Sequence, residues 1–113
     1  MGNWAIFVLL NLVMFSFTNG FKAFGEVVGD PVKGKDLYQK CAACHGGDGL
    51  GKKSQQAPML AGQYDWYVVN QIKAIQSKER SNANANKMYP FVKALSEQDI
   101  NDLASYIQSL KKR

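Results

Sequence analysis

The chain has few side chains that bind metal ions through sulfur or imidazole. Its 113 residues include two cysteines and one histidine, and all three lie in the pentapeptide Cys41-Ala42-Ala43-Cys44-His45. A structural zinc site usually takes four Cys or His ligands, so zinc here would have to recruit carboxylates. The single histidine also excludes a pair of histidines on one metal.

Convincing β-strands are also missing, and this argues against two other kinds of site. A thioredoxin-like dithiol needs a βαβ setting for its C-x-x-C motif. A phosphate-binding loop needs Ser or Thr after G-x-x-x-x-G-K, whereas Gly51-Lys52 is followed by Lys53. Four glycines in residues 46–51 instead predict an irregular loop, because glycine accepts positive φ and lets the backbone approach a flat ligand.

The net charge of +5 is spread along the chain, with no dense basic run beyond Lys111-Lys112-Arg113. Such scattered lysines do not indicate a nucleic-acid surface. A basic protein is steered towards acidic protein surfaces or anionic membranes. We therefore expect protein partners with acidic docking surfaces, and no nucleic acid.

One long apolar run, Trp4 to Phe17, stands at the N-terminus. It is shorter than the ~20 residues of a membrane span and suits the apolar region of a signal peptide. We predict that residues 1–25 form a signal peptide, cleaved between Gly20 and Gly25, or else an N-terminal membrane anchor. In both cases residues 26–113 would be exported to the periplasm, either soluble or held at the outer face of the cytoplasmic membrane.

The pentapeptide reads C-x-x-C-H, the attachment signal for c-type haem. Two thiols three residues apart, near the end of a helix, can each add to a vinyl group at one edge of a porphyrin. The next residue, His45, can then offer a ring nitrogen to the iron. We expect one covalently attached haem c, bound by Cys41, Cys44 and His45.

The remaining pattern predicts one all-α domain with three main helices around that haem. Asp30 followed by Pro31 is a typical helix start, and Ser96 with Asp99 resembles a capping box. Between the second and third helices the polar residues 81–86 are expected to form a loop. The predicted helices are Pro31 to Ala42, Tyr64 to Lys78 and Glu97 to Lys111.

Two methionines outside the export segment, Met59 and Met88, are candidates for the second axial ligand. Met59 lies 14 residues after His45, in a loop expected to pass the histidine side, whereas Met88 follows a full helix and can return on the opposite face. We therefore predict Met88; a lysine or an open site are the alternatives. Haem-ligating histidines usually donate their second ring N–H to a carbonyl, and Pro58 is the predicted acceptor.

From Gly34 onwards the chain resembles class I cytochromes c, particularly the bacterial cytochrome c4/c5/c-553 type. The resemblance implies the cytochrome c fold, His/Met ligation and periplasmic electron transfer, and it implies that Gly34 and Tyr38 cross the last helix near Leu103 and Tyr106. It rests on Gly34-x-x-x-Tyr38, on residues 41–49, on Pro58-x-Leu60-Ala61-Gly62-Gln63, on Tyr67, and on Met88 before Leu95-Ser96-x-x-Asp99.

We therefore expect a monohaem electron carrier and not an enzyme. One alternative is a membrane-anchored electron-entry subunit of an oxidase or dehydrogenase. Another is a haem enzyme or gas binder with an open sixth site, which is disfavoured because no second His or Arg is placed to cleave a peroxide. Tyr64, Trp66 and Tyr67 could bind a haem propionate or pack in the core, and the predicted lysines around the haem edge are Lys52, Lys53, Lys87 and Lys93.

Overall fold

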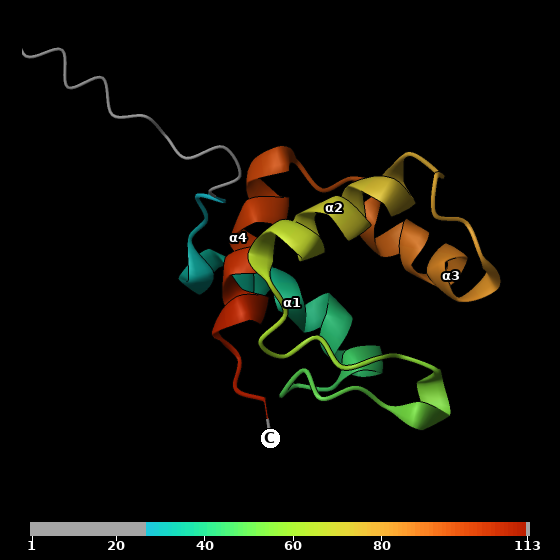
Figure 1. Ribbon diagram of the computed structural model, residues 1–113, viewed down its shortest axis with the longest axis horizontal. Helices are drawn as coiled ribbons and strands as arrows, with labels where there is room; N and C mark the ends of the chain where they lie inside the picture. Colours follow the sequence, from blue (N-terminus) through green and yellow to red (C-terminus); the bar gives the residue numbers. More distant parts are fainter. Residues whose placement is uncertain (1–26, 113) are drawn as a thin grey trace, which may run out of the picture.

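The computed structural model describes residues 27–112, and these residues form an all-helical fold with no strand (Figure 1). The predicted signal peptide or anchor over residues 1–25 lies outside the described part. None of the helices in residues 27–112 is long and apolar enough to cross a membrane. In chain order the elements are α1 (Pro31–His45), the short 3₁₀ helix η1 (Lys53–Gln55), α2 (Asp65–Gln76), α3 (Ala83–Val92) and α4 (Glu97–Ser109).

The capping residues start the first and last of these helices as predicted. Asp30 accepts a hydrogen bond from the N–H of Val32 at 2.9 Å, with Pro31 at the first helical position. Ser96 and Asp99 form a complete capping box at the start of α4. In both cases the side chains satisfy backbone donors that the first turn leaves without a helical partner.

The helix α1 ends at His45, so the predicted end at Ala42 was wrong. Gly46 stops the helix with φ +85°, and its N–H bonds back to the Ala42 carbonyl at 2.9 Å. The last turn therefore contains both cysteines and the histidine. This turn holds the whole attachment motif on one rigid element.

The helices α1 and α4 cross in close contact, as Figure 1 shows on its left side. A Cβ at Gly34 would lie 2.0 Å from the Asp102 carbonyl oxygen, so only glycine permits this approach. The rings of Tyr38 and Tyr106 pack beside the crossing with centroids 5.3 Å apart. The expected crossing of Gly34 and Tyr38 with the last helix is confirmed.

A fourth helix, α3, occupies residues predicted to be partly a loop. Asn82 caps its first turn, and Ala85 and Val92 bury their side chains against the core. The expectation of an irregular segment over 81–86 was wrong from Ala83 onwards, because packing of one helical face outweighs the polar composition and Pro90. The prediction of three main helices therefore needs this addition.

The hydrophobic core lies between the helices and draws on all four of them. Its buried members include Tyr38 on α1, whose exposed fraction is 1%. The other buried members are Val68, Val69, Ile72, Ile75, Ala85, Val92, Ile100, Leu103, Ala104 and Ile107. Partly buried residues that pack against this core include Cys41 and Met88, so these two of the predicted haem contacts border the core from different helices.

Candidate haem site

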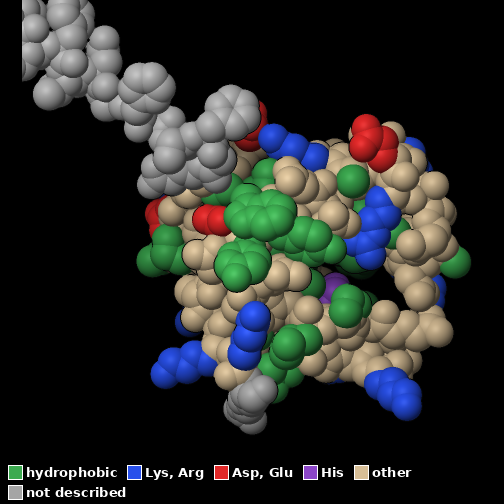
Figure 2. Space-filling view, in the orientation of Figure 1, with side chains coloured by type: hydrophobic (Ala, Val, Ile, Leu, Met, Phe, Trp, Pro, Cys, Tyr) green, Lys and Arg blue, Asp and Glu red, His purple; other side chains and the backbone are tan. Residues whose placement is uncertain are grey.

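The single histidine lies in a hollow of the molecular surface. Figure 2 shows a small part of this residue, in purple, beside a dark opening with hydrophobic side chains next to it, and His45 is only 5% exposed. Cys41 is half-buried and Cys44 is exposed, and both thiols are free in the polypeptide. Burial, and secondly the charge of Cys44, raise the pKa of the Cys41 thiol.

The His45 ring is oriented by the backbone of the following loop. Its Nδ1 atom lies 2.8 Å from the carbonyl oxygen of Pro58. Because a carbonyl can only accept, this contact is a hydrogen bond when Nδ1 carries the proton. The Nε2 nitrogen then keeps its lone pair for a metal. Sequence reasoning named both members of this pair.

Glycine geometry allows the loop to lie against the histidine. Gly46, Gly49 and Gly51 all have positive φ, between 72° and 85°, as expected for the glycine-rich segment. The Gly51 N–H bonds to the His45 carbonyl at 2.8 Å. A Cβ on Gly51 would lie 2.7 Å from the Ala57 carbonyl oxygen and 2.8 Å from the Pro58 carbonyl carbon, so this position has no room for a side chain.

The turn after His45 is tied to the core by Tyr38. The buried Tyr38 hydroxyl donates to the Gly46 carbonyl at 2.6 Å. Burial, followed by the nearby Cys41, Tyr106 and Asp48, raises the pKa of Tyr38 to about 12. The phenol therefore stays protonated, and remains a donor, through the physiological pH range.

The two candidate methionines differ in their surroundings. Met59 follows Pro58, so it belongs to the segment that contacts His45, and it is 48% exposed. Met88 lies on α3, is partly buried and packs against the core. Only Met88 therefore comes from an element separate from the histidine loop.

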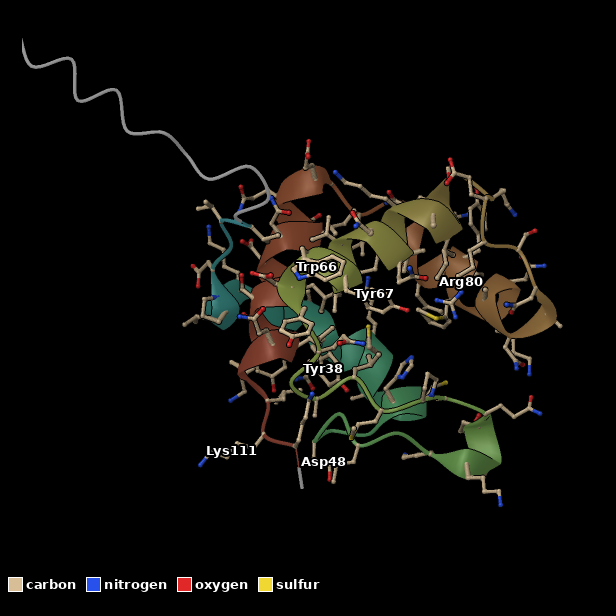
Figure 3. All side chains as sticks on the ribbon, in the orientation of Figure 1. Tyr38, Asp48, Trp66, Tyr67, Arg80 and Lys111 are labelled. Carbon is tan, nitrogen blue, oxygen red and sulfur yellow. The ribbon has the colours of Figure 1, made fainter. Side chains whose placement is uncertain are left out.

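Three aromatic residues around the start of α2 lie at the surface, and this excludes full core packing for them. Tyr64, Trp66 and Tyr67 are 65%, 49% and 40% exposed. The Tyr64 and Trp66 rings stack at 6.0 Å, and Trp66 meets Tyr67 edge-on at 5.9 Å. Figure 3 shows Trp66 and Tyr67 side by side on α2, above Tyr38.

The predicted lysines are all exposed, and two of them bind the loop segments. Lys52 Nζ donates to the Ala43 carbonyl at 3.2 Å, which ties the loop back to α1. Lys87 Nζ lies 3.5 Å from Gln56 Oε1. Lys53 and Lys93, the other two lysines of this predicted set, are exposed as well.

The family model for cytochrome c matches residues 31–111. The chain belongs to the cytochrome c family. Its cofactor is therefore haem c, for which Cys41, Cys44 and His45 form the attachment motif. The zinc and dithiol interpretations of that motif are thereby set aside.

Similar proteins include both short and long cytochromes. The chain is 41% identical over 81 residues to cytochrome c-554(548) of Halomonas halodenitrificans, covering 72% of this chain and 96% of that protein. It is 32% identical over 106 residues to cytochrome c4 of Azotobacter vinelandii, covering 88% of this chain but 50% of that protein. Reduced cytochrome c4 from Pseudomonas stutzeri has a similar structure, with TM-score 0.64 and 28% identity over 74% of this chain and 50% of that chain. The chain thus spans about half the length of these cytochromes c4.

The observed residues fit the haem that the family implies. The hollow contains a largely buried imidazole whose Nδ1 lies within hydrogen-bond distance of a carbonyl, and the cysteines share its helix end. Positive-φ glycines beside them let the loop backbone lie close against the turn that follows His45. The sequence did not single out Gln76, at the end of α2, which is hydrogen-bonded to backbone at the C-terminal end of α3; nothing in the motif indicated it.

Proposed function

We propose that this cytochrome c carries single electrons through one haem ligated by His45 and Met88 and linked to Cys41 and Cys44. The observation that supports this most is the contact between His45 Nδ1 and the Pro58 carbonyl, because it orients the ring and leaves Nε2 for the iron. Bound haem supplies reversible one-electron chemistry. The chain's own residues fix the ligands and exclude water.

Met88 is proposed as the second ligand because it reaches the core from α3. A neutral thioether raises the reduction potential of haem relative to other ligands, which suits an electron carrier. Met59 adjoins the Pro58 carbonyl that contacts His45. This placement on the histidine side argues against Met59 as the second ligand. A capped iron would also disfavour peroxidase or gas-binding chemistry.

Substitution of each methionine tests the ligand set. Met88→Ala should abolish the weak red absorption band of sulfur-bound ferric haem, lower the reduction potential and let ferrous haem bind carbon monoxide rapidly. Met59→Leu is the matched control and should retain the band. If the band remains in Met88→Ala and disappears in Met59→Leu, the ligand is Met59.

The proposed partners are redox proteins with acidic docking surfaces, met at the exposed lysines Lys52, Lys53, Lys87 and Lys93. We place the folded domain in the periplasm, after export by the segment 1–25. A diffusing carrier and a membrane-anchored electron-entry subunit differ in the fate of that segment. Cell fractionation and N-terminal sequencing distinguish them: a mature N-terminus between Gly20 and Gly25 in the soluble fraction supports the carrier.

A further inference from the structure

The helix that carries Met88 has one principal helical neighbour. Close packing joins α1 to α4, α2 to α4, and α3 to α2. Buried Ala85 and Val92 provide the apolar part of the α3 contact. In Figure 1, α3 lies beside α2 at the edge of the molecule, away from the α1–α4 crossing. The position of Met88 therefore depends mainly on how α2 holds α3.

The end of α3 is fastened to α2 by one side-chain amide. Gln76, the last residue of α2, donates from Nε2 to the Val92 carbonyl at 2.8 Å and to the Leu95 carbonyl at 3.0 Å. Val92 ends α3, and Leu95 precedes the start of α4. Carbonyls at a helix end lack intrahelical donors, and an amide NH₂ has two hydrogens to offer. Gln76 thus joins α2, the end of α3 and the turn before α4.

A second, weaker contact acts next to Met88 itself. Lys78 Nζ lies 3.6 Å from the centroid of the Tyr89 ring, and Tyr89 is partly buried against the core. A cation over an aromatic ring at an exposed site is a modest attraction. It supports the same placement of α3 but does not satisfy any buried backbone group.

We propose that Gln76 is a positioning residue for the sixth ligand, holding α3 so that Met88 stays on the iron. This inference rests on the proposed function, because it assumes Met88 ligation. Residues that hold a metal ligand determine how well the ligand is kept in place. Without the Gln76 amide, the Leu95 carbonyl loses this donor and the Val92 carbonyl keeps only the Leu95 N–H at 3.1 Å. Local opening of α3 should therefore become more frequent.

Carbon monoxide binding to the ferrous holoprotein reports that opening, since Met88 must leave before the gas binds. Gln76→Leu should accelerate binding about tenfold, because the net loss of one hydrogen bond approaches a factor of ten in an equilibrium constant. The matched control is Gln98→Leu. The Gln98 amide donates to Asp102 Oδ1 at 2.8 Å and to the Val28 carbonyl at 3.4 Å. The control variant therefore also loses two amide hydrogen bonds, but neither of them involves α3. Its carbon monoxide rate should equal that of the wild type, even where its urea midpoint falls.

A milder variant covers the case in which Gln76→Leu does not yield folded holoprotein. Gln76→Asn keeps the amide but is one methylene shorter, so it should bind carbon monoxide faster than the wild type and more slowly than Gln76→Leu. Met88→Ala is measured in parallel. Slow binding by Met88→Ala would contradict the proposed function. Two outcomes would overturn the positioning role alone, provided that Met88→Ala binds carbon monoxide fast. In the first, Gln76→Leu binds no faster than Gln98→Leu. In the second, Gln76→Asn binds at the wild-type rate.

Discussion

The Nδ1 atom of His45 and the carbonyl oxygen of Pro58 are 2.8 Å apart, although the two residues are 13 positions apart in sequence. The loop between them reverses over η1, which the antiparallel bridge between Lys52 and Ala57 encloses. Just before it, the Gly51 N–H bonds to the His45 carbonyl at 2.8 Å. One loop therefore both closes the end of α1 and orients the ring on its last residue. A change in this loop should reach the iron without altering any ligand.

Gly51→Ala should damage this relationship directly. The new Cβ would lie within 2.8 Å of the Pro58 segment, and alanine at φ +81° costs about 1–2 kcal/mol by itself. We expect a loss of at least ~1–2 kcal/mol in the free energy of unfolding. A shifted Pro58 carbonyl should also make the imidazole less basic and raise the reduction potential.

Gly47→Ala is the control for that substitution, measured by urea unfolding and by redox titration. Its Cβ would meet no atom within 4 Å, and its φ is not positive. The free energy of unfolding should stay within about 0.5 kcal/mol of the wild type. Equal stability and potential in both variants would show that the loop is not held as described.

Gly34→Ala should destabilise the α1–α4 crossing. An exposed helical glycine usually gains about 0.5–1 kcal/mol of stability when replaced by alanine. Here the Cβ would lie 2.0 Å from the Asp102 carbonyl oxygen and 2.8 Å from Tyr106 Cβ, so the helices must separate. We expect a net loss of about 1–3 kcal/mol, read from urea midpoints of the holoprotein; a gain in stability would refute the close crossing.

Tyr38→Phe should weaken the turn that follows His45 and change its pH dependence. The hydroxyl bond to the Gly46 carbonyl is lost, at a cost of about 1 kcal/mol. The folded-state pKa of Tyr38, about 12, exceeds the ordinary value of 10.0. Its contribution to stability is therefore complete below pH 10 and is lost as the pH rises towards 12.

Urea unfolding of both proteins at several alkaline pH values measures this difference. The wild-type advantage over Tyr38→Phe should shrink between pH 10 and pH 12, provided that both retain haem. An advantage that is constant across this range would mean that the Tyr38 phenol titrates alike in the folded and unfolded protein.

Much of the site was predictable because its chemistry is local in sequence. The attachment motif is contiguous, and the search for an acceptor of the histidine N–H led to Pro58. Capping residues located the starts of α1 and α4, since side-chain-to-backbone bonds depend only on near neighbours. The ends of helices were less predictable: α4 stops at Ser109 instead of Lys111, and α2 spans Asp65–Gln76 instead of Tyr64 to Lys78.

The helix α3 was missed because its stabilisation is tertiary. Its polar start and Pro90 favour a loop by local propensity. A helix could have been predicted from Asn82 as a cap and from an apolar stripe with helical spacing at Ala85, Met88, Tyr89 and Val92. The Gln76 bonds to Val92 and Leu95 span 16 and 19 residues, and no local pattern specifies such a partner.

Acid-acetone extraction of the purified protein shows whether one porphyrin is joined to Cys41 and Cys44 through thioether bonds. We predict that the pigment remains with the precipitated polypeptide, and that the intact mass exceeds that of the processed chain by one haem. Replacing either cysteine by serine should leave a single bond, and replacing both should release the pigment. Colourless protein, or pigment that passes from the wild type into the acetone, would contradict this account.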